Sequence, residues 1–255
     1  IQVYPMYENA IRYARKESVP EHLKRVSELW ARFNEVAIQN PNAWIQDAFT
    51  AEEIRTPTDT NRRISFPYTK MMNANMAVDM GAAIILCSVE KARELRIPEE
   101  KWVYPLAGVQ GYDHFSASVR DNFHSSPGLG LVGKRVMELA KVSPEEVDYV
   151  DLYSCFPSAV QIAARELGFS EERQLTVTGG LTFGGGPLNN YVMHAVARTV
   201  ELLRKAPGKK AFVSANGGNL YKHVHCVYSS QAPEEPYQYE NIQQEIDALP
   251  SRICL

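Results

Sequence analysis

The stretch GGLTFGGGPLNNY at residues 179–191 is the part of the chain richest in glycine, and its spacing decides which ligand it could hold. A phosphate-binding P-loop needs lysine and then serine or threonine after its last glycine, whereas Pro187 and Leu188 stand there. The dinucleotide fingerprint needs glycine at the first, third and sixth positions of one turn, and no window fits. The stretch therefore predicts a loop that needs positive φ or close backbone approach and leads into a helix.

Two histidines near the end of the chain have the side chain needed for proton transfer. In KHVHCVYSS, residues 222–230, His223 and His225 lie on one face of an expected strand and Cys226 on the other. His223 is the preferred acid/base candidate because it follows sooner after the glycine turn Gly217–Gly218. The alternative is a pair at the surface or satisfied within the core.

Cysteine offers the other reactive side chain. Cys155 stands at the end of an expected strand, where its thiolate would be a nucleophile. Its alternative role is that of a small apolar core residue. Cys87 falls within an apolar run and is expected to serve packing only. The spacing of the cysteines contains no CxxC pair and no disulfide framework, so we predict a reducing, cytoplasmic setting and no zinc or other metal site.

Composition excludes several classes of protein. The chain has 255 residues, of which 45% are hydrophobic and 22% charged, as in ordinary globular proteins. Its net charge is −3 with scattered lysine and arginine, which argues against a nucleic-acid partner. No apolar run approaches the roughly 20 residues that span a bilayer, so no membrane partner is expected.

Helical and extended patterns alternate along the chain and must position these residues. Residues 5–46 are expected to be helical, with a capping box at Ser18–Glu21 and a stop at Asn40–Pro41. Later helices are expected at 90–95, 131–140, 157–167 and 188–205. Strands are expected at 82–87, 102–110, 147–154, 174–178, 209–216 and 222–230. This alternation predicts an α/β fold whose sheet is covered by helices on both faces.

The order of these pieces resembles the thiolase superfamily, in particular its sterol-carrier-protein-X branch. The resemblance covers roughly residues 5–230 and rests on four motifs in the family's order. They are MNANMAVDMGAAIILCSVEKARELRI, SPEEVDYVDLYSCFPSAVQIAARELG, TGGLTFGGGPLNNY and FVSANGGNLYKHVHCVYSS. The resemblance implies a thiolase-like αβαβα layered sandwich, with a mixed sheet covered by helices and a helical loop or cap region at the N-terminal end.

The resemblance also implies a division into domains. Residues 1–75 would be a helical loop-domain portion, and 76–99 the end of the first thiolase core domain. Residues 100–230 would be the C-terminal core domain, and 231–255 a polar connector or tail. Because this order begins partway through the family's pattern, and the chain begins with Ile1, we expect the middle or rear of a longer polypeptide, with trimmed disordered ends as the alternative.

Thiolases use a cysteine nucleophile, a histidine base, a second cysteine as acid/base and two oxyanion holes. The resemblance places the histidine position on Gly186, the second cysteine on Ala215 and the oxyanion-hole asparagine or histidine on Tyr153. The resemblance places the nucleophilic cysteine in the first half of the fold, so it would either lie before Ile1 or be lacking in this protein. Glycine and alanine cannot transfer protons, so ordinary thiolase chemistry by the usual residues is not expected, whereas the tyrosine still donates a hydrogen bond.

The implied ligand is an acyl-CoA, with coenzyme A as substrate or ligand and no permanently bound cofactor. The thioester or pantetheine would be approached by the backbone N–H groups of Gly184, Gly185 and Gly186. The turn Gly217–Gly218 would lie beside them. Further contacts to the ligand would come from Asn73 and Asn75. His223, His225 and Cys155 are the replacement catalytic candidates. The expected function is an acyltransferase of the acetyl-CoA acetyltransferase superfamily in lipid metabolism, with degenerate second-half motifs. The alternatives are a silent CoA-binding scaffold or a retro-aldolase that uses Tyr153. The partner would be a second copy or the rest of a longer chain.

Overall fold

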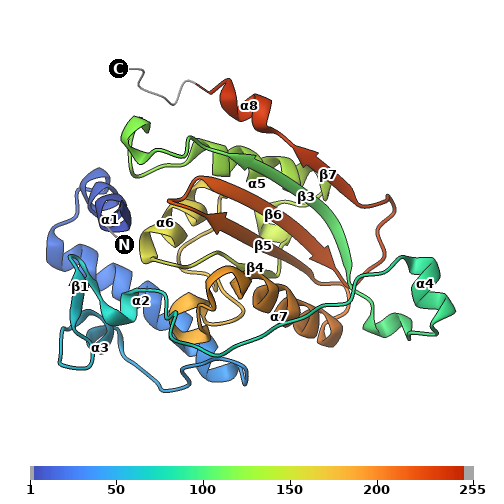
Figure 1. Ribbon diagram of the computed structural model, residues 1–255, viewed down its shortest axis with the longest axis horizontal. Helices are drawn as coiled ribbons and strands as arrows, with labels where there is room; N and C mark the ends of the chain where they lie inside the picture. Colours follow the sequence, from blue (N-terminus) through green and yellow to red (C-terminus); the bar gives the residue numbers. More distant parts are fainter. Residues whose placement is uncertain (1–2, 250–255) are drawn as a thin grey trace.

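The computed structural model describes residues 3–249 and centres on a five-stranded sheet with the order β4–β5–β6–β3–β7 (Figure 1). Neighbouring strands run parallel in the pairs β4–β5 and β3–β7 and antiparallel in the others, so the sheet is mixed. These strands are β3 (Tyr104–Tyr112), β4 (Tyr149–Asp151), β5 (Lys210–Gly217), β6 (Lys222–Ser229) and β7 (Gln238–Asn241). A separate hairpin joins β1 (Arg63–Ser65) and β2 (Tyr68–Thr69).

Helices surround the sheet and form the N-terminal region. They are α1 (Val3–Ala14), α2 (Val19–Gln39), α3 (Ala51–Arg55), α4 (Val89–Glu94), α5 (Pro127–Leu139), α6 (Pro157–Glu166), α7 (Tyr191–Lys205) and α8 (Gln243–Asp247). The predicted capping box is confirmed: Glu21 accepts the Ser18 N–H at 2.8 Å, and α2 ends at Gln39 with Asn40 as its C-cap. No helix among residues 3–249 is long and apolar enough to cross a membrane.

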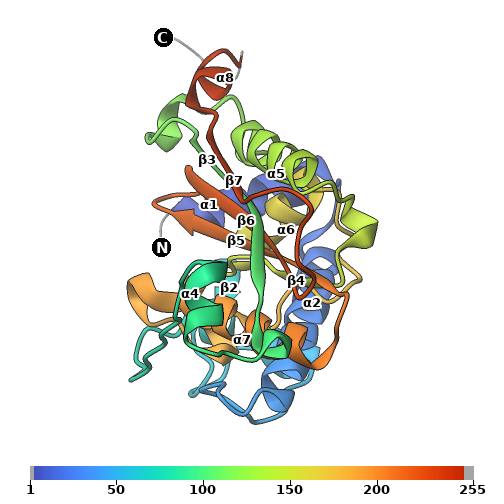
Figure 2. The same cartoon turned by 90° about the vertical axis from the view of Figure 1, so that its right-hand side faces the viewer.

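Alternation along β5 places two layers of helix on opposite faces of the sheet. Phe212 belongs to the main core, which includes α5 and α6, and the next residue, Val213, belongs to a second cluster with α7. Successive strand residues point to opposite faces, so α5 and α6 cover one face and α7 the other. Figure 1 shows α5 and α6 behind the sheet, and Figure 2, turned by 90°, shows both on the same side of it. The predicted α/β fold with a mixed sheet and helices is confirmed.

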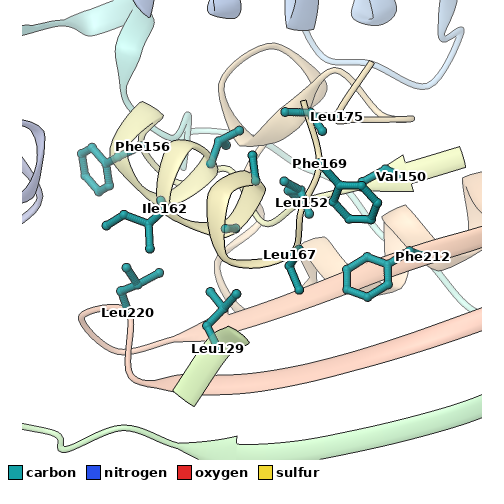
Figure 3. Close-up of a cluster of buried hydrophobic side chains, with 14 of the residues drawn as sticks. Leu129, Val150, Leu152, Phe156, Ile162, Leu167, Phe169, Leu175, Phe212 and Leu220 are labelled. Atoms are coloured by element: carbon teal, nitrogen blue, oxygen red, sulfur yellow. The ribbon is translucent and has the colours of Figure 1, made fainter. Parts of the chain in front are cut away.

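The main core fills the space between the sheet and α6. Figure 3 shows Phe169 and Phe212 facing each other, with their ring centroids 5.5 Å apart, beside Val150, Leu152 and Leu167. Each of these side chains is 5% exposed or less. Burying an aliphatic or aromatic side chain contributes roughly 1.5–3 kcal/mol, so this layer is what fixes β4 and β5, the strands that lead into the candidate site.

Two predicted strands are absent from the described structure. Residues 174–178 are irregular: the Leu175 carbonyl accepts the Leu152 N–H just after β4 at 2.9 Å, but the N–H groups of Val177 and Thr178 bond to the side chains of Asp151 and Thr176. Residues 82–87 are extended but unpaired, and Cys87 is exposed rather than packed in a core. The apolar run alone reveals a strand-forming tendency but not whether a partner strand is present.

The expected polar connector at 231–255 contains structure as far as residue 249. Its strand β7 extends the sheet at the edge of β3, and Ile242 and Ile246 are buried in the main core. Residues 250–255, which include Cys254, lie outside the described residues. The boundaries expected between the loop domain and the two core domains stay predictions.

Candidate functional site

Tyr153 and Cys155 lie in the short segment between β4 and α6. The backbone N–H of Tyr153 donates to Ser214 Oγ of β5 at 2.9 Å, and its ring packs edge-on against Tyr191, with centroids 5.5 Å apart. Among residues 3–249 no hydrogen bond is formed by the hydroxyl of Tyr153, a half-buried residue. Burial, and then the neighbouring Cys155, raise the pKa of Tyr153 to about 12. The phenol is therefore protonated at neutral pH and free to donate a hydrogen bond.

Cys155 contacts polar side chains that sequence reasoning missed. Asn216 Nδ2 lies 3.9 Å from Cys155 Sγ and 3.3 Å from Tyr4 Oη. The Tyr4 hydroxyl in turn donates to the Gly218 carbonyl at 3.1 Å, which joins α1 to the turn after β5. Asn216 stands between Ala215 and Gly217 in a motif that had been singled out, so its position was a usable signal. Tyr4 carried none, because it is 214 residues from its partner.

The segment after β2 brings the expected asparagines to the same place. The Ala74 N–H donates to the Cys155 carbonyl at 3.1 Å, and the Asn75 N–H donates to the Leu181 carbonyl at 3.0 Å. The Asn73 side chain donates to Thr69 O at 2.6 Å, and its Oδ1 is buried without a partner. The structure thus gathers the segment containing Asn73 and Asn75 beside Cys155 and the glycine loop.

The glycine loop forms a π-helical turn, Gly180–Gly184, before α7 begins. Gly184 has no room for a side chain, since a Cβ would lie 2.8 Å from Thr178 O. Gly185 has φ 109°, and a Cβ there would collide with Met80 Sδ. However, the N–H of Gly184 donates to Gly179 O at 3.4 Å and that of Gly186 to Asn75 O at 2.9 Å. These two N–H groups bond within the protein, which corrects the expectation that they are available to a thioester.

A buried carboxylate holds this loop against β4. Asp151 Oδ2 accepts bonds from the Val177 N–H at 2.9 Å and Thr176 Oγ1 at 2.9 Å, and Oδ1 accepts one from Tyr191 Oη at 2.8 Å. Thr178 Oγ1 adds a longer contact of 3.3 Å. Burial raises the pKa of Asp151 to about 6 despite these donors. Asp151 therefore ties the loop and the first residue of α7 to one point.

The two histidines are not brought into contact with this site. His223 is fully buried, and its Nε2 lies 3.1 Å from Asp113 Oδ2 and 3.3 Å from Ser126 Oγ at the start of α5. Burial acts against the Asp113 charge, but the bonds from His223 and Ser126 hold the pKa of Asp113 below its usual value. His223 is therefore engaged in a structural pair, and no hydrogen bond joins it to Tyr153 or Cys155.

His225 is enclosed in the core. Burial, and then neighbouring His223, lower the pKa of His225 well below its usual value, so its imidazole is neutral. The ring packs against Phe212 with centroids 5.2 Å apart, and neither nitrogen has a partner among the described residues. A fully buried ring of this kind cannot exchange protons with a ligand at Tyr153 without opening of the core.

Thiol labelling distinguishes the cysteines of the described chain. Burial raises the pKa of Cys155 and of Cys226 to about 11, whereas Cys87 is exposed. Because the thiolate is the reactive form, iodoacetamide at pH 7.5 should modify Cys87 at least tenfold faster than Cys155 or Cys226. Peptide mapping by mass spectrometry gives the three rates. Fast labelling of Cys155 would instead restore it as a nucleophile.

Comparison with known proteins agrees with this architecture. No protein-family model matches the chain. The structure of a protein from Mycobacterium smegmatis, described as a monomeric SCP2-thiolase-like protein type 1, is 32% identical and superposes with a TM-score of 0.87 over 99% of this chain and 56% of that one. Human mitochondrial 3-ketoacyl-CoA thiolase, at 16% identity and a TM-score of 0.61, covers 89% of this chain and 59% of that one and shares the fold.

Curated relatives point the same way at lower identity. An acetyl-CoA acetyltransferase of Methanothermobacter thermautotrophicus is 24% identical over 72% of this chain and 51% of its own length. A 17-hydroxy-3-oxo-4-pregnene-20-carboxyl-CoA lyase of Mycobacterium tuberculosis is 26% identical over 61% of this chain and 40% of its own length. The chain thus spans about half the length, or less, of the curated relatives it matches.

The mixed sheet between α5–α6 and α7, with a glycine loop leading into α7, defines a thiolase-type fold, and the chain belongs to the thiolase superfamily. Within that superfamily it is SCP2-thiolase-like.

Proposed function

We propose that the chain binds acyl-CoA thioesters, with the Tyr153 hydroxyl as the hydrogen-bond donor to the thioester oxygen. One observation carries this proposal. Tyr153 lies beside Cys155 and packs on the cluster that contains Leu181 of the glycine loop, and its hydroxyl forms no hydrogen bond to another described residue. A protonated phenol held by packing is a preorganised donor, which is the chemistry an oxyanion hole requires. Asn73 and the loop around Gly185 would line the path of the pantetheine, and coenzyme A would be a ligand rather than a resident cofactor.

Acyl transfer would need a nucleophile from outside this sequence. Cys155 has a raised pKa and Cys87 lies on the unpaired segment, while Gly186 and Ala215 stand where thiolases carry a histidine and a cysteine. We therefore propose that, within this chain, the site binds acyl-CoA without forming an acyl-cysteine. The acyltransferase role then depends on a second polypeptide segment that carries the nucleophile. A role in lipid metabolism and a cytoplasmic location remain part of this proposal.

A retro-aldol reaction is the second candidate, and Tyr153 favours it. Cleavage of a 3-hydroxyacyl thioester leaves an enolate whose charge rests on the thioester oxygen, where a phenol can stabilise it. Similarity to a CoA-linked lyase at 26% identity supports this candidate. A structure with the same fold, at 18% identity and a TM-score of 0.65, is described as an Ltp2–ChsH2(DUF35) aldolase. That aldolase is a complex, and we propose that this chain also functions with another polypeptide or a second copy.

Calorimetric titration with acetyl-CoA tests the proposed ligand. The Tyr153→Phe variant should bind about tenfold more weakly, because loss of one buried hydrogen bond costs about 1.4 kcal/mol. Tyr13→Phe is the matched control, since Tyr13 is 81% exposed on α1, and its affinity should be unchanged. Absence of binding by the unmodified chain, or equal affinities of the three proteins, would contradict the proposal.

Two further readouts separate the candidate activities. Intact mass after incubation with acetyl-CoA should show no acyl adduct, and an adduct would argue for acyl transfer by a residue of this chain. Release of an aldehyde or ketone from a 3-hydroxyacyl-CoA, lost in Tyr153→Phe, would establish the retro-aldol candidate. Unchanged turnover in that variant would remove Tyr153 from the reaction.

A further inference from the structure

A cleft with a volume of about 300 Å³ lies beside β4, at the edge of the five-stranded sheet. Arg32 of α2, Tyr149 at the start of β4, Val177 of the irregular segment, and Arg198 and Leu202 of α7 all line it. No residue of the proposed thioester site is among the lining residues. The volume is at the lower end of the range for small-molecule sites, roughly 300–1,000 Å³. The cleft is thus a second place in this chain where a small ligand could bind.

Two arginines from different walls of the cleft have unused hydrogen-bond donors. The Nε–H groups of Arg32 and Arg198 are both buried, and neither has a partner among residues 3–249. Only 28% of the Arg32 side chain and 16% of the Arg198 side chain are exposed. A buried donor without a partner is destabilising, and native structures contain few of them. Two such donors at one small cleft indicate a ligand that supplies acceptors.

The free donors of Arg198 lie on the edge of the guanidinium that binds carboxylates. Its Nη1 donates to Glu201 at 2.8 Å, whereas its Nε and Nη2 form no bond to the described residues. Nε–H and Nη2–H point in the same direction and match the two oxygens of a carboxylate. In Arg32, Nη2 donates to the Glu171 carbonyl at 2.8 Å, which fixes that guanidinium and leaves its Nε free. Arg198 therefore has a bidentate pair of donors, and Arg32 has one more.

The remaining lining favours one kind of anion. Val36, Val177 and Leu202 supply apolar surface on which a hydrocarbon chain can pack. Glu35, which is exposed, also lines the cleft. Its negative charge would repel a phosphate, which carries close to two negative charges, more than a carboxylate, which carries one. A single negative charge joined to a short apolar chain therefore fits this cleft better than a phosphate does.

We propose that this cleft binds a small organic monocarboxylate, whose carboxylate pairs with Arg198 and Arg32 and whose apolar chain packs on Leu202. The ligand is the free acid, because an acyl group in a thioester lacks the charge. The site goes beyond the proposed acyl-CoA function and does not depend on it. Val177 lines the cleft and donates its N–H to Asp151 at 2.9 Å. A bound acid would therefore pack on the segment that Asp151 ties to the glycine loop.

Titration of the chain with butyrate, followed by NMR of the protein amides, tests the site. Butyrate should shift the amide signals of Val177 and Leu202 and bind with a dissociation constant of about 1 mM, as expected for so small a ligand. Butyramide has nearly the same shape without the charge and should bind at least tenfold more weakly. Arg198→Gln should weaken butyrate binding at least tenfold, and Arg198→Lys, which keeps the charge but not the paired donors, should weaken it less. Lys205→Gln, at an exposed position of the same helix, is the matched control and should leave the affinity unchanged.

Further measurements separate this site from misfolding and from the thioester site. The ion-pair partner of Arg198, Glu201, is 44% exposed, so the melting temperature of Arg198→Gln should stay within about 2 °C of that of the unmodified chain. Tyr153→Phe should bind butyrate as the unmodified chain does. Absence of saturable butyrate binding, equal binding of butyramide, or unchanged affinity of Arg198→Gln would overturn the proposal, and tighter binding of inorganic phosphate would overturn the choice of a carboxylate. Acetyl-CoA titration is scored separately, so the two proposals can fail independently.

Discussion

Asp151→Ala should lower the free energy of unfolding at pH 7 by about 3–5 kcal/mol, because it leaves buried donors from Val177, Thr176 and Tyr191 without an acceptor. Asp151 is fully buried, so water cannot replace the carboxylate without opening the loop. Urea denaturation followed by circular dichroism measures the loss. Asp148→Ala is the matched control, since its partner Lys209 is half exposed, and it should cost about 1 kcal/mol or less.

The pH dependence of Asp151 gives an independent check. Its pKa is raised from 3.8 to about 6 in the folded protein, so the folded state binds the proton more tightly than the unfolded state between these values. The stability contributed by this group is fully present below about pH 4 and is lost as the pH rises through 6. The change corresponds to about 3 kcal/mol. Asp151→Asn should remove this slope, and an unchanged slope would show that other groups dominate.

Glu8→Ala should have an effect of similar size through a different network. Glu8 is fully buried in α1 and accepts bonds of 2.7 Å from His22, Gln161 and Tyr68. Removal of the carboxylate leaves those donors buried and unpaired, which should cost about 3–5 kcal/mol in denaturant unfolding. The helix α1 also carries Tyr4, which contacts Asn216 beside Cys155. The affinity of the Glu8→Ala variant for acetyl-CoA should therefore fall together with its stability.

A surface glutamate on the neighbouring helix serves as the control. Glu28 is about half exposed on α2 and lies 4.0 Å from Lys24, so Glu28→Ala should change the free energy of unfolding by no more than about 0.5 kcal/mol. Glu8→Gln keeps the volume and one acceptor oxygen and should fall between the two. Equal stability of Glu8→Ala and Glu28→Ala would mean that α1 is not held by this network.

Local signals in the sequence were sufficient to predict most of the helices and strands. Ser18, Glu21 and Asn40 delimit α2 by capping chemistry, the strand expected at 209–216 corresponds to β5, and the alternating run at 222–230 corresponds to β6. Residues 82–87 show where such signals stop. Their apolar run indicates a strand correctly in conformation, but hydrogen-bond partners come from elsewhere, and no local pattern reveals whether they are present.

The candidate site was predictable only where the family's motifs run through it. Tyr153, Cys155 and the glycine loop were found by motif position, and the structure gathers them with Asn73. Asp151 was missed although it stands two residues before Tyr153, because nothing in a single sequence distinguishes a buried carboxylate from an exposed one. Period-two spacing correctly placed His223 and His225 on one face of β6, but it could not show that this face packs against α5, where His223 contacts Ser126 and His225 lies near Gly133.

The bonds between α1 and the turn after β5 also constrain the order of folding. Tyr4 and Tyr7 donate to Gly218 and Asn219, across sequence separations of 214 and 212 residues. During synthesis, the first helix must therefore wait until almost the whole described chain has emerged before it can dock in its final position. Contacts of such long range carry a high loop-closure cost and slow folding. The surface on which α1 docks is thus among the last to be completed, and until then Tyr4 is absent from the proposed acyl-CoA site.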